Sequence, residues 1–166
     1  MKTKAPFVDF LLALLVVAMD RASKLWVVHH VPMFKRRQII PSFFQITHTE
    51  NSGAAFSLFA DSASRWKEQA LIAFSLAALA VLLYLLAQQK QAFSKGAIAI
   101  SLIMGGAVGN LWDRIAHGRV VDFLLFYVGK YEWPVFNLAD SCIVVGAILL
   151  AWSILWTTEA EKSSTN

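Results

Sequence analysis

The pattern of hydrophobic and polar positions along the chain is dominated by four long apolar runs. Each run approaches the roughly 20 apolar residues that a helix needs to cross about 30 Å of hydrocarbon. They lie at residues 7–28, 70–87, 96–112 and 135–156. The pattern therefore predicts four transmembrane helices. The two longer connections, residues 29–69 and 113–134, follow the first and third runs, so four successive spans would place both connections on one side of the membrane.

Two segments inside these connections have the composition of β-strands. Residues 39–47 combine β-branched and aromatic side chains with an early proline. Residues 120–127 form a second segment that is either strand-like or lies along the membrane surface. Ahead of the second apolar run, residues 61–69 predict a helix start with Asp61 or Ser62 as its cap. The expected fold is one all-α membrane domain over residues 1–166, with four transmembrane helices and a small β-rich surface subdomain.

The composition agrees with a membrane protein. Hydrophobic residues make up 57% of the 166-residue chain and charged residues only 16%, which lies outside the range of ordinary soluble domains. Lys2 and Lys4 ahead of the first apolar run resemble a secretory signal. However, Asp20 and Arg21 stand where a small-residue cleavage site is expected, which favours a retained helix. The single Cys142 has no partner, which excludes an internal disulfide and a thiolate metal site.

The charge distribution does not indicate nucleic-acid binding. The net charge is +4, but the basic residues are scattered, and the short cluster at residues 35–37 is expected to meet anionic lipid headgroups. Eight lysine and arginine residues lie on the side of the two long connections and five on the other side. Taken literally, the positive-inside rule would place the long connections in the cytoplasm. The length of the first connection weakens that inference.

Polar residues inside the apolar runs are the candidates for chemistry, because an ionisable residue within a membrane indicates function by default. Asp20 and Lys24 are four residues apart, so they share a helix face and can pair. Together with Asp113 or Arg114, this pair is expected to have a structural role, in which the charges neutralise one another and orient the helices. Asn110 lies near the end of the third run.

A pair of aspartates is the strongest candidate. Asp122 lies in the apolar run between the third and fourth spans, and Asp140 lies three residues after Asn137, about one turn into the last span. Two carboxylates held close together cannot both ionise easily and share a proton. The ionised member can activate a water while the protonated member donates to the carbonyl under attack, as in aspartic proteases. An ion pair between Asp122 and Arg119 is the alternative.

Other catalytic patterns are weaker. The histidines lack the HExxH spacing of a zinc protease, and no serine lies in a GxSxG motif. Residues 51–56 have the sequence NSGAAF. This segment is either a tight turn that uses its glycine or an element that presents an amide side chain and backbone groups to an extended peptide. The sequence leaves both interpretations open.

With these residues, the sequence resembles the lipoprotein signal peptidase family, also called signal peptidase II. Members of this family are aspartic proteases of the bacterial inner membrane. The resemblance covers nearly the whole chain. It rests on four motifs: DRASK at residues 20–24, NSGAAF at 51–56, GNLWDR at 109–114 followed by VDF at 121–123, and FNLADS at 136–141.

The resemblance implies a role for each matched position. Asp122 and Asp140 would be the catalytic pair, and Asp20 and Lys24 would support the site structurally. The residues expected to line or brace the site are Asn51, Gly53, Asn110, Arg114 and Asn137. It further implies prolipoprotein substrates that carry diacylglycerol on a cysteine and cleavage just before that cysteine. The active site would face the periplasm, with both termini in the cytoplasm. The chemistry of two carboxylates needs no metal or other cofactor. A monomer surrounded by membrane phospholipid is the default expectation, because nothing in the sequence argues for another state.

Two functions from other classes remain as alternatives. A proton-coupled transporter or channel could use the acids as a relay, although transporters usually show related halves with broken helices near the midplane. Here the acids cluster towards one face and no internal repeat is visible. A non-catalytic scaffold that binds lipid or a membrane partner through its elaborated face is the second alternative.

Overall fold

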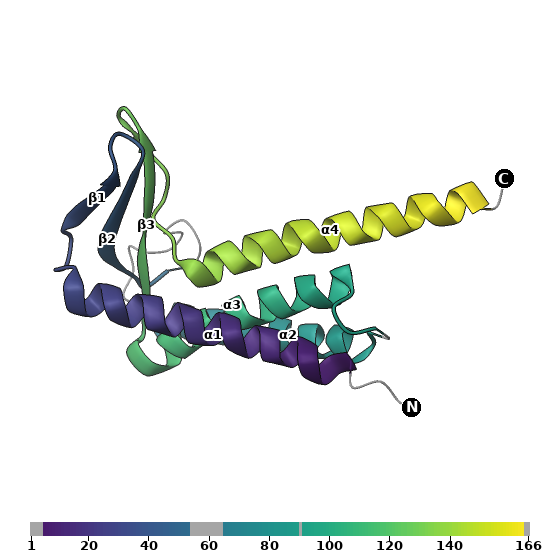
Figure 1. The fold of residues 1–166 in the computed structure, drawn as a ribbon. Helices are drawn as coiled ribbons and strands as arrows, with labels where there is room; N and C mark the ends of the chain where they lie inside the picture. Colours follow the sequence, from purple (N-terminus) through teal and green to yellow (C-terminus); the bar gives the residue numbers. More distant parts are fainter. Residues whose placement is uncertain (1–4, 54–64, 90, 165–166) are drawn as a thin grey trace.

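The computed structural model describes residues 5–53, 65–89 and 91–164. Figure 1 shows a bundle of helices with a β-sheet at the end where α1 finishes and α4 begins. The elements within the described residues are α1 (Ala5–His30), β1 (Arg36–Ile40), β2 (Phe44–Asn51), α2 (Arg65–Ala87), α3 (Lys95–His117), β3 (Val120–Val128), β4 (Tyr131–Glu132) and α4 (Leu138–Ser164).

All four predicted helices are present, but their ends differ from the prediction. The expected connection 113–134 was wrong at its start, because α3 continues to His117 and contains both Asp113 and Arg114. The helix stops at Gly118, which has a left-handed φ of 70° and donates its backbone N–H to the Arg114 carbonyl at 2.9 Å. This is a glycine C-cap. The predicted caps Asp61 and Ser62 lie outside the described residues.

Within the part of the chain that the structure describes, three helical segments are long and apolar enough to cross a membrane, namely Trp66–Ala87, Lys95–His117 and Leu138–Leu155. The 26-residue α1 has sufficient length but carries several charged side chains. Asp9, Asp20 and Lys24 are almost completely buried inside the protein.

The third helix is the centre of the bundle. Most of α3 is buried, whereas α2 and α4 are largely exposed. Its glycines allow close backbone approach, because a Cβ added at Gly105 would lie 2.7 Å from the Ala13 carbonyl oxygen of α1, and one at Gly106 would overlap the Ala139 carbonyl of α4. The predicted packing role of this small-residue face is therefore confirmed for these glycines.

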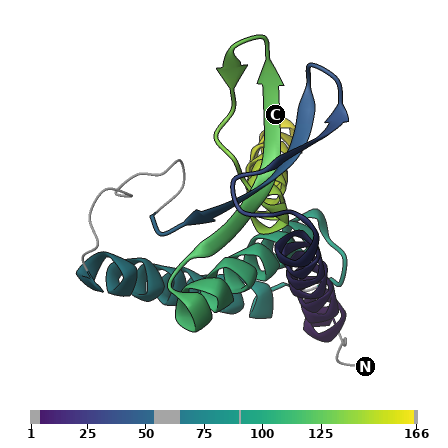
Figure 2. The ribbon, with the colours of Figure 1, turned by 90° about the vertical axis from the view of Figure 1, so that its left-hand side faces the viewer.

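The strands form one antiparallel sheet in the order β1-β2-β3-β4. The prediction of a single extended segment at 39–47 was wrong, because a turn separates β1 from β2. Ser42 has a φ of 60°, and the Phe43 N–H donates to the Ile40 carbonyl at 3.2 Å. The predicted segment 120–127 is confirmed as β3. Figure 2 shows the sheet standing across the end of the bundle.

Contacts to both terminal helices hold the sheet against the bundle. Val27 of α1 and Val31, which directly follows that helix, pack with Phe123 of β3. On the other side, the backbone N–H groups of Phe123 and Leu124 donate to the Phe136 carbonyl at 3.0 and 2.8 Å. The middle of β3 is thus fixed to the residues that immediately precede α4.

The glycine contacts lead to a stability prediction. We expect Gly106→Ala to destabilise the protein by about 1–3 kcal/mol, because the added methyl must push α3 away from α4. Gly96→Ala is the matched control, since its Cβ would lie 3.4 Å from the flexible Gln89 side chain. Thermal unfolding in detergent micelles measures both, and equal melting temperatures would contradict the packing argument.

Candidate active site

A buried lysine organises the charged side chains under the sheet. Lys24 Nζ lies 2.8 Å from a carboxylate oxygen of Asp20 and 2.8 Å from one of Asp113, and it donates to Asn110 Oδ1 at 3.0 Å. Lys24 is 1% exposed, and both carboxylates are fully buried. Arg21 forms a further ion pair with Asp113. The Lys24 ammonium therefore has three oxygen neighbours, and in this cluster two cations balance two anions.

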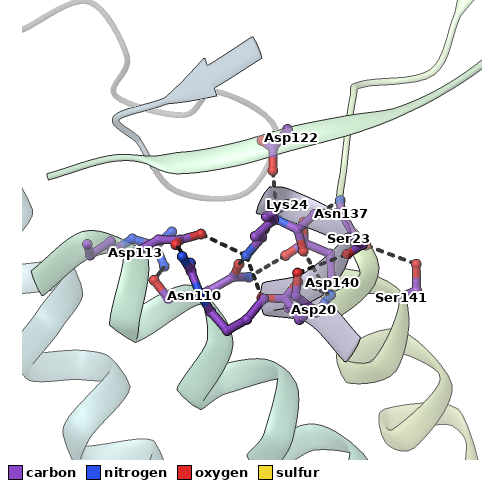
Figure 3. Close-up of polar contacts among 12 residues, drawn as sticks. Asp20, Ser23, Lys24, Asn110, Asp113, Asp122, Asn137, Asp140 and Ser141 are labelled. Carbon is purple, nitrogen blue, oxygen red and sulfur yellow. Dashed lines mark hydrogen bonds and ion pairs between the residues drawn. The ribbon is translucent and has the colours of Figure 1, made fainter. Parts of the chain in front are cut away.

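Asn110 connects this cluster to Asp140. Its Oδ1 accepts from Lys24 and also from Asn137 Nδ2 at 3.1 Å, which leaves its Nδ2 to donate to Asp140 Oδ1 at 2.7 Å. The orientation of the Asn110 amide is thus determined by the ammonium on one side and the carboxylate on the other (Figure 3).

Asp140 lies in the first turn of α4, where Asn137 caps the helix. The Asp140 N–H donates to Asn137 Oδ1 at 2.9 Å, and the Asn137 N–H donates to Asp140 Oδ2 at 3.2 Å. This reciprocal pair has the geometry of a capping box. A carboxylate at a helix N-terminus also has a favourable interaction with the helix dipole. The sequence Asn-x-x-Asp therefore fixes both side chains locally.

Asp122 approaches the same place from β3. Its Oδ1 accepts from Asn137 Nδ2 at 2.7 Å and its Oδ2 accepts from Asn51 Nδ2 at 3.0 Å. Asn51 is oriented in turn by the Gly53 N–H, which donates to Asn51 Oδ1 at 2.9 Å. This side-chain-to-backbone turn at residues 51–53 presents the Asn51 amide to the Asp122 carboxylate. Residues 54–56 of that motif lie outside the described residues.

The environment raises the pKa of Asp122 to about 6. Burial is the largest cause, because the side chain is 5% exposed and loses its hydration. The negative charge of Asp140 adds to the increase, and the hydrogen bonds from Asn51 and Asn137 to the ionised form oppose it. Asp122 therefore changes its protonation state close to neutral pH.

Both aspartates line one cavity of about 730 Å³. Asn51, Asn110 and Arg114 share this polar end, and Arg114 donates to the Asn110 carbonyl at 3.3 Å and to the Gly53 carbonyl at 3.4 Å. The remaining wall comes mainly from apolar side chains of α2, α3 and α4, including Leu71, Phe74, Leu82, Ile103, Ala107 and Val144. The cavity thus joins two acids to an apolar channel between helices.

The structure brings together most of the residues that the sequence singled out. The predicted Asp20–Lys24 pair is confirmed. The alternative ion pair between Asp122 and Arg119 was wrong, because Arg119 Nη1 lies 2.7 Å from Oε2 of Glu50 on β2. Sequence reasoning left open whether Asp113 or Arg114 joins the Asp20–Lys24 pair, and the structure places Asp113 against Lys24. The position of Asp113 three residues after Asn110 on the same helix was the available signal.

The donor set of the site consists of amides and carboxylates. Within residues 5–53, 65–89 and 91–164, no group of three or more histidine, cysteine, aspartate and glutamate side chains is arranged to hold a metal ion. The expectation that the reaction needs no cofactor remains a prediction.

Sequence comparison decides the family. The profile of the family described as Signal peptidase (SPase) II matches residues 12–156. The chain belongs to the signal peptidase II family. The lipoprotein signal peptidase of Shewanella oneidensis is 39% identical over 91% of this chain and 88% of its own length. That of Xylella fastidiosa is 41% identical over 83% of this chain and 82% of its own length.

Solved structures agree with this signal peptidase II assignment. One bacterial membrane enzyme superposes with a TM-score of 0.81 at 32% identity and covers 91% of this chain and 89% of its own. A second superposes with a TM-score of 0.80 at 30% identity, over 93% and 97%. The chain is an aspartic peptidase of the signal peptidase II type, and the peptidase interpretation is confirmed over the transporter and the scaffold.

The buried ion cluster leads to a second prediction. We expect Lys24→Met to destabilise the protein by about 3–5 kcal/mol, because it leaves two buried carboxylates without their shared cation. Arg36→Met is the control, since it breaks an ion pair with Glu132 whose side chains are 51% and 44% exposed, for which a loss below about 1 kcal/mol is expected. Thermal unfolding in micelles compares the two, and similar losses would show that Lys24 is not the central contact.

Proposed function

We propose that Asp122 and Asp140 are the catalytic pair of an intramembrane aspartic endopeptidase that removes signal peptides from diacylglyceryl-modified prolipoproteins. The observation that carries this proposal is that two carboxylates from different elements line one cavity and share Asn137. The substrate class rests on the family and on the relatives named lipoprotein signal peptidase. The bond cleaved is the one just before the lipidated cysteine.

The reaction follows from one proton shared by the two aspartates. The ionised aspartate takes a proton from a water, and the resulting hydroxide attacks the scissile carbonyl carbon. The protonated aspartate donates to the carbonyl oxygen, giving a tetrahedral intermediate that collapses when the leaving nitrogen is protonated. The raised pKa of Asp122 supports this scheme, since it allows the pair to hold a proton near neutral pH.

The amide side chains position the pair. The two carboxylates accept hydrogen bonds from the side-chain amides of Asn51, Asn110 and Asn137. These bonds fix the side-chain rotamers of both aspartates, which face the cavity. Arg114 braces the turn at Gly53 against α3 through its two carbonyl contacts. Asp20 and Lys24 act through these residues and support the site structurally.

The cavity matches an apolar peptide with one polar reacting bond. Its apolar wall between the helices suits the hydrophobic segment of a signal peptide, and its polar end places the scissile bond beside the aspartates. The diacylglyceryl group remains in the surrounding phospholipid. The enzyme acts as a monomer in this scheme.

The arrangement of charges supports membrane insertion of α1 as a fourth span. Asp20 and Lys24 are paired inside the protein, so this part of α1 does not present isolated charges to lipid. Figure 1 shows both ends of the described chain at the end of the bundle opposite to the sheet. We place this end in the cytoplasm and the catalytic end at the periplasmic face of the inner membrane.

The catalytic pair can be tested by removing each acid separately. We expect Asp122→Asn and Asp140→Asn each to abolish cleavage of a diacylated precursor in micelles, because an amide can neither activate water nor supply the proton. Asp9→Asn is the matched control, since Asp9 is also a buried aspartate but lies at the far end of the bundle, where Oδ1 accepts from the Phe93 N–H.

Folding of each variant is checked by its melting temperature. Wild-type cleavage by either Asp122→Asn or Asp140→Asn would remove that residue from the mechanism. Loss of cleavage in Asp9→Asn with an unchanged melting temperature would show that the assay responds to changes unrelated to the pair.

The pKa of Asp122 predicts the pH dependence. As the pH rises through about 6, the shared proton is lost, so kcat/KM of the wild-type enzyme should fall along a limb near that pH. Asn51→Ala removes a hydrogen bond that favours ionised Asp122, which raises its pKa and should move the limb to higher pH. Initial rates across pH 4–9 measure the position of this limb for the wild-type enzyme and for the variant. A limb that shifts to lower pH in the variant would contradict the argument.

A further inference from the structure

The sheet reaches sideways beyond the helices. In Figures 1 and 2, the strands run across the direction of the bundle, and the β1–β2 and β3–β4 turns project past α4. The apolar segment Leu138–Leu155 of α4 is itself largely exposed, as expected for a lipid-facing helix. A bilayer that surrounds the helices would therefore lie next to these two turns, beside α4.

Both turns carry exposed apolar side chains, which we call the hairpin tips. Single exposed apolar residues are common, but a cluster on two neighbouring turns marks a contact surface. The tips consist of Ile39 (47% exposed), Ile40 (48%), Phe43 (47%), Val128 (67%) and Tyr131 (75%).

The chemistry of the tips matches the headgroup layer of a bilayer. Lys130 Nζ lies 5.6 Å from the centre of the Tyr131 ring, and tyrosine with a long cationic side chain is typical of the lipid–water interface. Behind the tips, Arg36 forms an ion pair with Glu132, so these two charges are already balanced. A phospholipid surface is therefore the occupant that both the position and the composition favour.

We propose that the hairpin tips insert into the phospholipid headgroup layer beside α4 and thereby set the position of β3 relative to the membrane. Val128 is at one end of β3, and Asp122 lies six residues away on the same strand, at about 20 Å. A strand held at its tip by lipid and at its middle by Phe136 has little freedom to tilt. The membrane contact thus helps to position Asp122, which is the part of the proposal that rests on the proposed function.

The membrane contact is tested without any substrate. A fluorophore attached at Lys130→Cys, in a Cys142→Ser background, reports on the β3–β4 turn, because Lys130 is exposed there and its substitution leaves the left-handed Gly129 (φ 57°) in place. In vesicles of phosphatidylethanolamine and phosphatidylglycerol with brominated acyl chains, we expect strong quenching by lipid and protection from aqueous iodide. Quenching by iodide alone would overturn the proposal, and so would self-quenching between labelled copies, which would assign the tips to a protein interface.

A matched pair of variants tests the residues. Val128→Ser with Tyr131→Ser should reduce lipid quenching several-fold. Val81→Ser with Tyr84→Ser makes the same substitutions on α2, at side chains that are 57% and 64% exposed, and should leave quenching at the wild-type level. Unchanged quenching in the tip variant would show that these side chains do not make the contact.

Cleavage in vesicles tests the consequence for the site. We expect the tip variant to lose several-fold in kcat/KM in vesicles relative to its own value in micelles, where no bilayer positions the sheet. If the tip variant shows reduced quenching but unchanged cleavage in vesicles, the proposal that the membrane contact helps to position Asp122 is overturned. If the wild-type protein quenches as expected but cleaves no lipidated precursor, the proposed function fails while the membrane contact stands.

Discussion

The buried ammonium of Lys24 is the contact on which the rest of the site depends. It touches carboxylates from α1 and α3, and it orients Asn110, whose amide holds Asp140 of α4. The Asp20 carboxylate also accepts from the Ala139 N–H at 3.1 Å. Three helices therefore meet at one cation. Because an unpaired charge in this setting is far more costly than a paired one, the pairing selects one relative placement of these helices.

Amide side chains transmit that placement to the two aspartates. An asparagine both accepts and donates, so Asn110 can face a cation with its oxygen and a carboxylate with its nitrogen. Asn137 also acts as both acceptor and donor. Its side-chain oxygen accepts from the Asp140 N–H, and its side-chain nitrogen donates to Asp122. A lysine placed directly against the aspartates would stabilise their ionised forms and lower their pKa values. Neutral intermediates fix the geometry with a smaller electrostatic effect.

The sequence predicted those features that depend on local periodicity. Apolar runs located the helices, and the i,i+4 spacing identified the Asp20–Lys24 pair. Features that depend on distant partners were missed or misplaced. The end of α3 is set by a glycine cap, which puts Asp113 inside the helix and against Lys24. Similarly, strand register brings Glu50 of β2 beside Val121, so Arg119 at the start of β3 meets a cross-strand carboxylate instead of Asp122. Neither register nor cap geometry can be read from hydropathy.

The two aspartates are held by different parts of the structure, Asp140 by the helix bundle and Asp122 by the sheet. Asp140 is fixed within the bundle by its own helix cap and by Asn110. Asp122 is carried by a strand whose attachments are the Phe136 carbonyl, the α1 contact at Phe123 and two amides. A displacement of the sheet would therefore move Asp122 against a stationary Asp140. The distance between the two carboxylates is therefore governed by how the sheet lies on the bundle, and the proposed sharing of a proton depends on that distance.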